Sequence, residues 1–259
     1  MSNSLQYYWK IVAKDSKGAT SSGPVWSFTT QSNNGTIPTD GLLLYYPFTD
    51  GDIYIGPNGK MIKDYSSYHN DGVLNDVAGG NGPTPTSDRH QVPNRALNFN
   101  GNGYILINNV IHITNKVTFS FWTKHSSKAT LGIISKRNGD WGPPYGDASN
   151  NNWQVASEIG GLLSLALWGT SEESKPTNTM IATGEWTHIA IIWDGSEVRH
   201  YVNSILVFSF PNSGNVNDND HQTRIGDDWW GNYFIGNLDD IRIYNRALTQ
   251  QEITALYNE

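Results

Sequence analysis

Two loops rich in aromatic residues carry the side chains best suited to binding chemistry. The first runs Trp141-Gly-Pro-Pro-Tyr145, directly after Asp140, and the second runs Asp227-Asp-Trp-Trp-Gly-Asn-Tyr233. Aromatic rings offer a flat apolar face, and Asp and Asn side chains offer hydrogen-bonding groups beside it. That combination suits a sugar ring, which has apolar C–H faces and many hydroxyl groups. The residues expected to bind such a ligand are Trp141, Tyr145, Trp229, Trp230, Asp140 and Asp228.

The alternative is that some of these rings pack inward. Successive side chains of an extended segment point to opposite faces, so Trp229 and Trp230 are expected to send one ring into the core and one outward. Three other tryptophans lie in strand-like apolar runs and are expected in the core, namely Trp122, Trp186 and Trp193. His188 lies two residues from Trp186 and is expected to be a packed, structural histidine.

The carboxylates and histidines do not form a recognisable catalytic pattern. A retaining glycosidase needs two carboxylates close together, and no Glu-x-Asp-x-x-Glu run supplies them. Asp239 and Asp240 are adjacent, so we expect them on opposite faces of a strand rather than as a pair. The seven histidines lack metal-ligand spacing, and no serine nucleophile elbow is present. The sequence therefore favours binding over catalysis.

Composition narrows the classes of partner. The net charge is −7, and no cluster of Lys and Arg supplies the basic surface that a nucleic acid requires. No apolar run is long enough to span a bilayer as a helix. The absence of cysteine excludes disulfides and thiolate metal sites.

Short strand-length runs separated by turn-rich loops predict an all-β sandwich or jelly roll. A single helix is expected at the C-terminus, because Thr249 and Glu252 form a capping box before an apolar run. The predicted strands are 42–48, 96–99, 104–107, 117–123, 131–136, 153–159, 162–168, 186–193, 198–202, 205–210 and 238–244.

The pattern of the first thirty residues indicates a different module from the rest of the sequence. Residues 5–30 are predicted to form two strands: apolar and polar side chains alternate over 5–13 and again over 25–30, and Asp15-Ser-Lys-Gly18 supplies a turn between them. The pattern over 7–30 resembles the last two strands of a fibronectin type III domain. A lone hairpin is marginal in water, so we expect residues 1–30 to belong to a preceding module of a longer, multi-module protein. Residues 31–40 are polar and turn-rich and predict a linker. The main domain is then 41–259.

An ordered series of motifs in this main domain resembles the concanavalin A-like jelly roll of the laminin-G-like kind. The series includes Leu43-Leu-Tyr-Tyr-Pro-Phe48, Ala96-Leu-Asn-Phe-Asn-Gly-Asn-Gly-Tyr104, Phe119-Ser-Phe-Trp122, Gly184-Glu-Trp-Thr-His-Ile-Ala190 and Gly236-Asn-Leu-Asp-Asp-Ile-Arg-Ile-Tyr-Asn-Arg-Ala-Leu248. Two residues depart from the usual pattern, Ser204 in place of Gly and Asn100 in place of Asp. The segment 138–152 is unusually long.

The resemblance implies a structural calcium ion, which in this sequence would be held by Asp50, Asp64, Asn70 and Asp239. The alternative is that these residues bond turn and loop backbone. The resemblance also implies a secreted or cell-surface setting, with any export signal outside this sequence. Its members include non-catalytic carbohydrate-binding modules, adhesion or spacer domains, and glycoside hydrolases and lyases. We expect the first, with a polysaccharide or glycoconjugate as partner.

Overall fold

The computed structural model describes residues 6–29, 35–77, 79, 82–126, 129, 131–137, 151–172 and 174–259. The chain divides into two compact units. The first consists of Met1–Ile37 with Gln250–Glu259, and the second of Pro38–Thr249. Among the described residues, no helix is long and apolar enough to cross a membrane.

The N-terminal part of the first unit is a hairpin. Strand β1 (Gln6–Trp9) pairs with β4 (Trp26–Thr29), and β2 (Val12–Lys14) pairs with β3 (Thr20–Ser22). Across the hairpin the rings of Trp9 and Trp26 stack with their centroids 4.6 Å apart. Most of the hairpin's described side chains are exposed, because two strands alone bury little surface.

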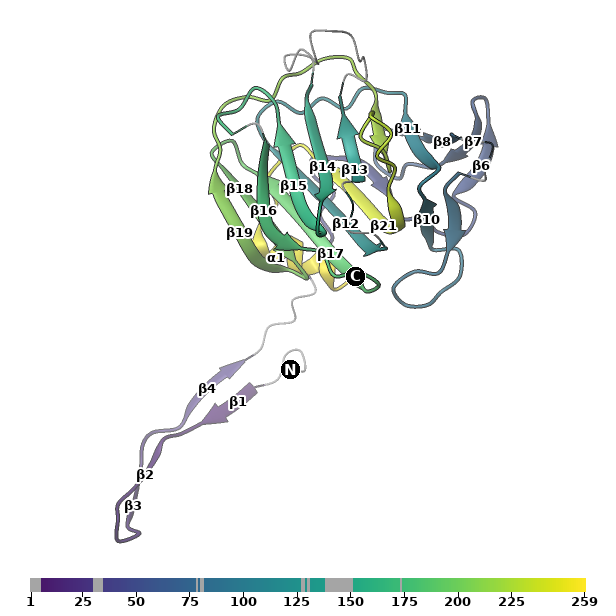
Figure 1. Cartoon of the computed structure of the whole chain (residues 1–259). Helices are drawn as coiled ribbons and strands as arrows, with labels where there is room; N and C mark the ends of the chain where they lie inside the picture. Colours follow the sequence, from purple (N-terminus) through teal and green to yellow (C-terminus); the bar gives the residue numbers. More distant parts are fainter. Residues whose placement is uncertain are drawn as a thin grey trace. The chain divides into compact units, whose positions relative to one another are not determined.

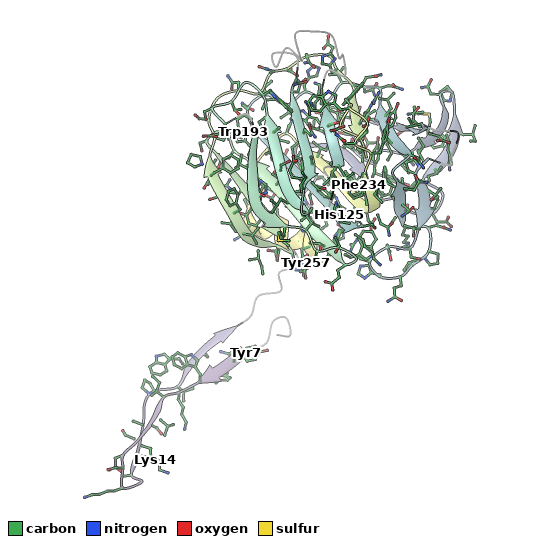
Figure 2. All side chains as sticks on the ribbon, in the orientation of Figure 1. Tyr7, Lys14, His125, Trp193, Phe234 and Tyr257 are labelled. Atoms are coloured by element: carbon green, nitrogen blue, oxygen red, sulfur yellow. The ribbon has the colours of Figure 1, made fainter. Side chains whose placement is uncertain are left out.

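The first unit also contains the predicted C-terminal helix, α1 (Gln250–Tyr257). It begins directly after Thr249 and buries Ile253, Ala255 and Leu256. Figure 2 labels Tyr257 at its end. The existence of this short helix confirms the sequence prediction.

The second unit is a sandwich of two antiparallel sheets, which confirms the predicted all-β jelly roll (Figure 1). In the described part of the chain, one sheet contains eight strands and the other contains nine. The eight are β5 (Leu42–Tyr46), β9 (Thr84–Thr86), β10 (Ala96–Asn100), β12 (Val117–His125), β17 (Trp186–Trp193), β18 (Glu197–Val202), β19 (Ile205–Pro211) and β21 (Ile235–Tyr244). The nine are β6 (Ile53–Gly56), β7 (Gly59–Ile62), β8 (Gly72–Asp76), β11 (Gly103–Ile107), β13 (Leu131–Lys136), β14 (Trp153–Glu158), β15 (Leu162–Leu167), β16 (Ser174–Met180) and β20 (Thr223–Ile225).

The core lies between the two sheets. Phe119 of β12 and Trp153 of β14 meet across it with ring centroids 5.0 Å apart. Trp193 of β17 (Figure 2) is also fully buried in this core. Trp122 is buried, as predicted, although it packs under the guanidinium of Arg89, which lies 4.7 Å from its ring, and not in the main core cluster. Trp186 is only half-buried.

Alternation along β14 and β15 decides which residues the nine-stranded sheet presents on its outer face. Trp153 and Val155 of β14 point into the core, and so do Leu163, Leu165 and Leu167 of β15. Because successive side chains of a strand point to opposite faces, the residues between them lie on the other face. That outer face therefore carries Gln154, Ser164 and Ala166.

Candidate functional site

A loop crosses the outer face of the nine-stranded sheet and carries the second aromatic motif. The Gly132 amide of β13 donates to the carbonyl of Asn232 at 2.9 Å, and the Ser135 hydroxyl donates to the carbonyl of Asp227 at 2.7 Å. A Cβ atom at Gly132 would lie 2.3 Å from the backbone nitrogen of Asp228. Only glycine lets the loop backbone approach β13 this closely.

Asp228 organises this loop from within. Its carboxylate accepts hydrogen bonds from the Trp230 amide at 2.9 Å, the Asn232 amide at 3.1 Å and the Asn232 Nδ2 at 2.6 Å. The residue is 2% exposed. An Asp that bonds the backbone two and four residues onward is a common way to fix a tight loop. Asp228 therefore holds Trp230 in place and also lines the cavity described below.

Arg137, directly after β13, lies between two indole rings. Its guanidinium carbon is 3.5 Å from the ring centroid of Trp230 and 4.6 Å from that of Trp168. Its Nη1 donates a hydrogen bond to Oε1 of Gln154. Arg137 is 4% exposed, and burial lowers its pKa to about 10 against the opposing effect of Asp228. A guanidinium on an aromatic face is attracted by the ring quadrupole, so Arg137 fixes both rings.

These groups surround an open cavity of about 310 Å³ on the outer face of β14 and β15. Trp230 remains 44% exposed there. Glu158, at the end of β14, accepts a hydrogen bond from the Ser164 hydroxyl at 2.8 Å. The lining residues are Arg137, Gln154, Glu158, Ser164, Ala166, Trp168, Asp228, Trp230 and Asn232. The cavity thus combines an accessible indole with amide, hydroxyl and carboxylate groups.

The neighbouring Trp229 forms a second stack on the same face. Its ring centroid lies 3.6 Å from the guanidinium carbon of Arg224 on β20, and the ring of Tyr104 on β11 lies 4.3 Å from that carbon. Arg224 also pairs with Asp227 at 2.5 Å. The expectation that one of the two adjacent tryptophans enters the core is wrong, because neither ring belongs to the core cluster. Trp229 has a φ of 72°, so the alternation of an extended chain does not apply to it.

Of the six predicted ligand-binding residues, the structure brings Asp228 and Trp230 to one cavity and places Trp229 beside it on a different arginine. Asp140, Trp141 and Tyr145 lie outside the described residues.

The four predicted calcium ligands occupy different surroundings. Asp64 is fully buried, and its two oxygens accept hydrogen bonds from the amides of Tyr45, Ser66 and Asn70 and from the Ser66 hydroxyl. The Asn70 side chain donates to the carbonyl of Leu43 at 2.9 Å. These contacts give Asp64 and Asn70 protein partners of their own.

The other two lie elsewhere. Asp50 is exposed and lines a cavity of about 290 Å³ beside Phe48 and Asn94. Asp239 is 3.0 Å from the guanidinium of Arg89. Within the described residues, no group of three or more His, Cys, Asp or Glu side chains could hold a metal ion. Calcium binding by Asp50, Asp64, Asn70 and Asp239 stays a prediction.

The structure corrects a second expectation, because the carboxylates of Asp239 and Asp240 lie together on one arginine. Nη1 of Arg89 lies 3.0 Å from Asp239 and 2.7 Å from Asp240. The backbone at Asp240 has a φ of 48°, and the pairing of β12 with β21 shifts register here. A bulge of this kind lets adjacent side chains point the same way. Burial and the charge of Asp240 raise the pKa of Asp239, and Arg89 opposes the rise.

His188 is 1% exposed, and its Nε2 lies 3.0 Å from the Ser120 hydroxyl. Burial first, and then the positive charges of Arg242 and Arg89, lower its pKa to about 3. This agrees with the structural role expected from the sequence.

Six residues of the cavity lie outside the loop that the sequence predicted, namely Arg137, Gln154, Glu158, Ser164, Ala166 and Trp168. A signal for two of them was present. Gln154 and Ser164 are polar residues at alternate positions of otherwise apolar strands, which marks a face turned away from the core.

Comparisons with known proteins agree with this architecture. The family model Laminin_G_3, of the concanavalin A-like lectin/glucanases superfamily, matches residues 99–254, and the chain belongs to this family. A search among curated proteins finds no match. Nothing in the comparisons supports the fibronectin-like resemblance of residues 1–30.

Several solved structures share the fold. Domain 4 of AbnA, a GH43 extracellular arabinanase from Geobacillus stearothermophilus, in complex with arabinotriose, is 21% identical with a TM-score of 0.63, covering 85% of this chain and 100% of that chain. The receptor binding domain of botulinum neurotoxin C/D mosaic serotype is 15% identical with a TM-score of 0.61, and the match covers 85% of this chain and 52% of that chain. The binding domain of Paraclostridial Mosquitocidal Protein 1 is 17% identical with a TM-score of 0.56, and the match covers 84% of this chain and 52% of that chain. The chain thus spans about half of each toxin domain, and at these identities the likeness shows the fold alone.

Proposed function

We propose that the sandwich is a non-catalytic carbohydrate-binding module whose site is the cavity beside Trp230. The observation that carries this proposal is the exposed Trp230 indole, held on the buried Arg137 guanidinium at 3.5 Å and surrounded by polar side chains. A sugar ring lies with its C–H face on the indole while its hydroxyl groups bond the side chains around it. Arg137 holds the indole before the ligand arrives, which lowers the cost of ordering it on binding.

The polar groups of the cavity suit hydroxyl groups in particular. Glu158 supplies a hydrogen-bond acceptor, Ser164 supplies a hydroxyl, and Asn232 supplies an amide. The arabinanase domain that shares the fold was solved with arabinotriose, which supports a saccharide as the class of ligand. A single cavity of this size predicts modest affinity, of about micromolar to millimolar Kd.

Glycoside hydrolysis is the second candidate function, because two carboxylates, Glu158 and Asp228, line the cavity. A glycosidase needs one carboxyl group to protonate the leaving oxygen and another to act as base or nucleophile. Asp228 is poorly suited to either role, since it is 2% exposed and accepts three hydrogen bonds from its own loop. This geometry favours binding without catalysis.

The wider setting follows from the proposed ligand. A polysaccharide partner implies a secreted or cell-surface protein, in which neighbouring modules raise avidity. Residues 1–30 remain, on this proposal, the end of a fibronectin-like neighbour, and Trp141 and Tyr145 remain proposed ligand contacts. A calcium ion, if bound, would stabilise the sandwich and take no part in the ligand site. An adhesion or spacer role is the alternative if no glycan binds.

Retention of the full chain in native gels that contain soluble arabinan, galactan, xylan or glucan tests the proposal. We expect at least one polymer to slow migration, and we expect no release of reducing ends during prolonged incubation with it. Failure of every polymer, followed by failure on a broad glycan array, would reject carbohydrate binding. Release of reducing ends that is abolished by Glu158→Gln would instead establish a hydrolase.

A further inference from the structure

The arginine-supported ring at Trp230 has a counterpart on the same sheet. Trp230 and Trp168 contact the Arg137 guanidinium, with ring centroids 3.5 and 4.6 Å from its carbon atom. The ring centroid of Trp229 lies 3.6 Å from the guanidinium carbon of Arg224. Each of the two adjacent tryptophans therefore packs on an arginine of its own.

Two tyrosines enlarge the cluster around Arg224. The ring centroid of Tyr104 lies 4.3 Å from the guanidinium carbon. The rings of Tyr104 and Tyr233 have centroids 6.4 Å apart and an angle of 12° between their planes. The residue that follows each of Tyr104 and Arg224 in its strand belongs to the core, so alternation turns these two side chains to the outer face of the sheet.

The cluster around Arg224 presents mainly aromatic surface. Tyr104, Trp229 and Tyr233 are all half-buried, so part of each ring remains accessible. Arg224 pairs with Asp227 at 2.5 Å, which balances the arginine charge within the protein. A partly exposed aromatic surface over a balanced ion pair suits the apolar C–H face of a sugar ring, as the Trp230 indole does.

Strand order places the two clusters in one row. Trp168 follows β15 and Arg137 follows β13. Arg224 belongs to β20, and Tyr104 belongs to β11. The strands are neighbours in the order β15-β14-β13-β20-β11 (Figure 1), so the row crosses four strand spacings. At about 4.8 Å each, these spacings add up to about 19 Å. One unit of an extended sugar chain is about as long as one strand spacing, so the row accommodates about four units.

We propose, on the basis of the carbohydrate-binding function above, that Tyr104, Trp229 and Tyr233 form a second subsite and that the ligand is a linear stretch of about four sugar units lying across the strands. A chain of this length contacts both clusters at once, whereas a disaccharide contacts only one. The second contact forms within the same complex, so it adds affinity without a second loss of translational freedom. The face therefore selects polysaccharide chains over short sugars.

The test compares ligands of different length. Oligosaccharides of two, four and six units are prepared from whichever of arabinan, galactan, xylan and glucan retains the full chain, and Kd is measured by isothermal titration calorimetry. We expect Kd to fall by at least about tenfold from the disaccharide to the tetrasaccharide, and by less than about threefold from the tetrasaccharide to the hexasaccharide. Equal Kd values for the three lengths would overturn the second subsite and leave the carbohydrate function standing. Failure of every polymer to bind would reject the carbohydrate function itself.

Tyr104→Ala tests whether the second cluster supplies the gain with length. The variant should leave the Kd of the disaccharide unchanged and reduce the advantage of the tetrasaccharide to less than about threefold. Damage to the fold or to the Trp230 loop would instead weaken both lengths alike and keep their ratio. A tetrasaccharide advantage that survives the substitution would overturn the proposal.

Two further variants complete the comparison. Tyr104→Leu keeps an apolar side chain on β11 and removes the flat ring, so it gives the same comparison if the alanine variant unfolds. Tyr45→Ala is the matched control, since Tyr45 is a half-buried tyrosine on β5 of the other sheet, 3.8 Å from the guanidinium carbon of Arg242. It should keep the wild-type ratio of the two Kd values, and equal ratios in the Tyr45 and Tyr104 variants would reject the second subsite.

Discussion

The guanidinium carbon of Arg137 lies 3.5 Å from the centre of the Trp230 indole, although the two residues are 93 positions apart in the chain. Arg137 directly follows β13, and Trp230 belongs to the loop that crosses that strand. The stack fixes the orientation of the exposed Trp230 ring. The loop by itself would leave this ring free to rotate. The binding proposal and the predictions below depend on this contact.

Trp230→Ala tests the ring itself. Because the indole is 44% exposed, its removal should lower Tm by no more than about 4 °C, while the Kd for a retained glycan should rise by at least about tenfold. Differential scanning calorimetry and affinity electrophoresis measure the two effects. Trp26→Ala is the matched control, since Trp26 is 40% exposed on the hairpin and should not change retention. Loss of binding accompanied by general unfolding would identify Trp230 as a structural residue.

Gly132→Ala tests the position of the loop. The new Cβ would lie 2.3 to 2.7 Å from backbone atoms of Asp227 and Asp228, so the loop must move. We expect weaker glycan binding and a loss of about 2 kcal/mol in the free energy of unfolding, measured with urea. Gly23→Ala is the control, because the nearest atom to its Cβ would be 3.5 Å away. Unchanged binding in Gly132→Ala would show that the loop tolerates displacement.

Asp64→Asn separates a hydrogen-bonding role from a calcium-binding role. Four N–H or O–H donors converge on the Asp64 carboxylate, so the substitution should cost about 3 kcal/mol of stability. The loss should be the same in calcium and in EGTA, because all four donors belong to the protein. Asp50→Asn, at an exposed position, should change stability by less than about 0.5 kcal/mol in either condition.

The opposite pattern would support the sequence-based calcium prediction. If EGTA lowers the Tm of the wild type and leaves both variants unaffected, then Asp50 and Asp64 bind the ion.

The burial of His200 leads us to predict that the stability of the fold depends on pH. The residue is fully buried beside Phe208, and neither ring nitrogen has a hydrogen-bond partner among the described residues. Burial lowers its pKa to about 4 in the folded state, against about 6.5 in the unfolded chain. Between pH 6.5 and 4 the unfolded state therefore binds the extra proton, and stability falls as the pH falls.

His200→Phe should remove this contribution. Urea unfolding at pH 7 and at pH 4.5 should show an acid-induced loss smaller than that of the wild type by about 2 kcal/mol, with the slope from His188 retained. His90→Phe, at an exposed histidine, is the control and should follow the wild-type curve. An unchanged acid-induced loss in His200→Phe would contradict the assignment.

Strand prediction from the sequence succeeded for runs with a clear apolar pattern and missed several short or polar strands. Runs such as 153–159 and 186–193 alternate or are continuously apolar, which is a local signal, and they became β14 and β17. The missed strands are short or largely polar, as in β9 (Thr-Pro-Thr) and β20 (Thr-Arg-Ile). Such strands form because a neighbour in the sheet supplies their hydrogen bonds, and no local pattern reports that neighbour.

The sequence alone determined the all-β class, the family resemblance and the aromatic loop at 227–233, because composition, alternation and ordered motifs are properties of the chain itself. Only the tertiary structure decided that Arg137, Gln154 and Ser164 meet Trp230, since sheet pairing joins segments that are remote in sequence. It also decided that Asp239 and Asp240 share Arg89, because a bulge overrides the alternation that the sequence predicts. A strand pattern specifies which face a residue occupies, and only packing specifies what that face meets.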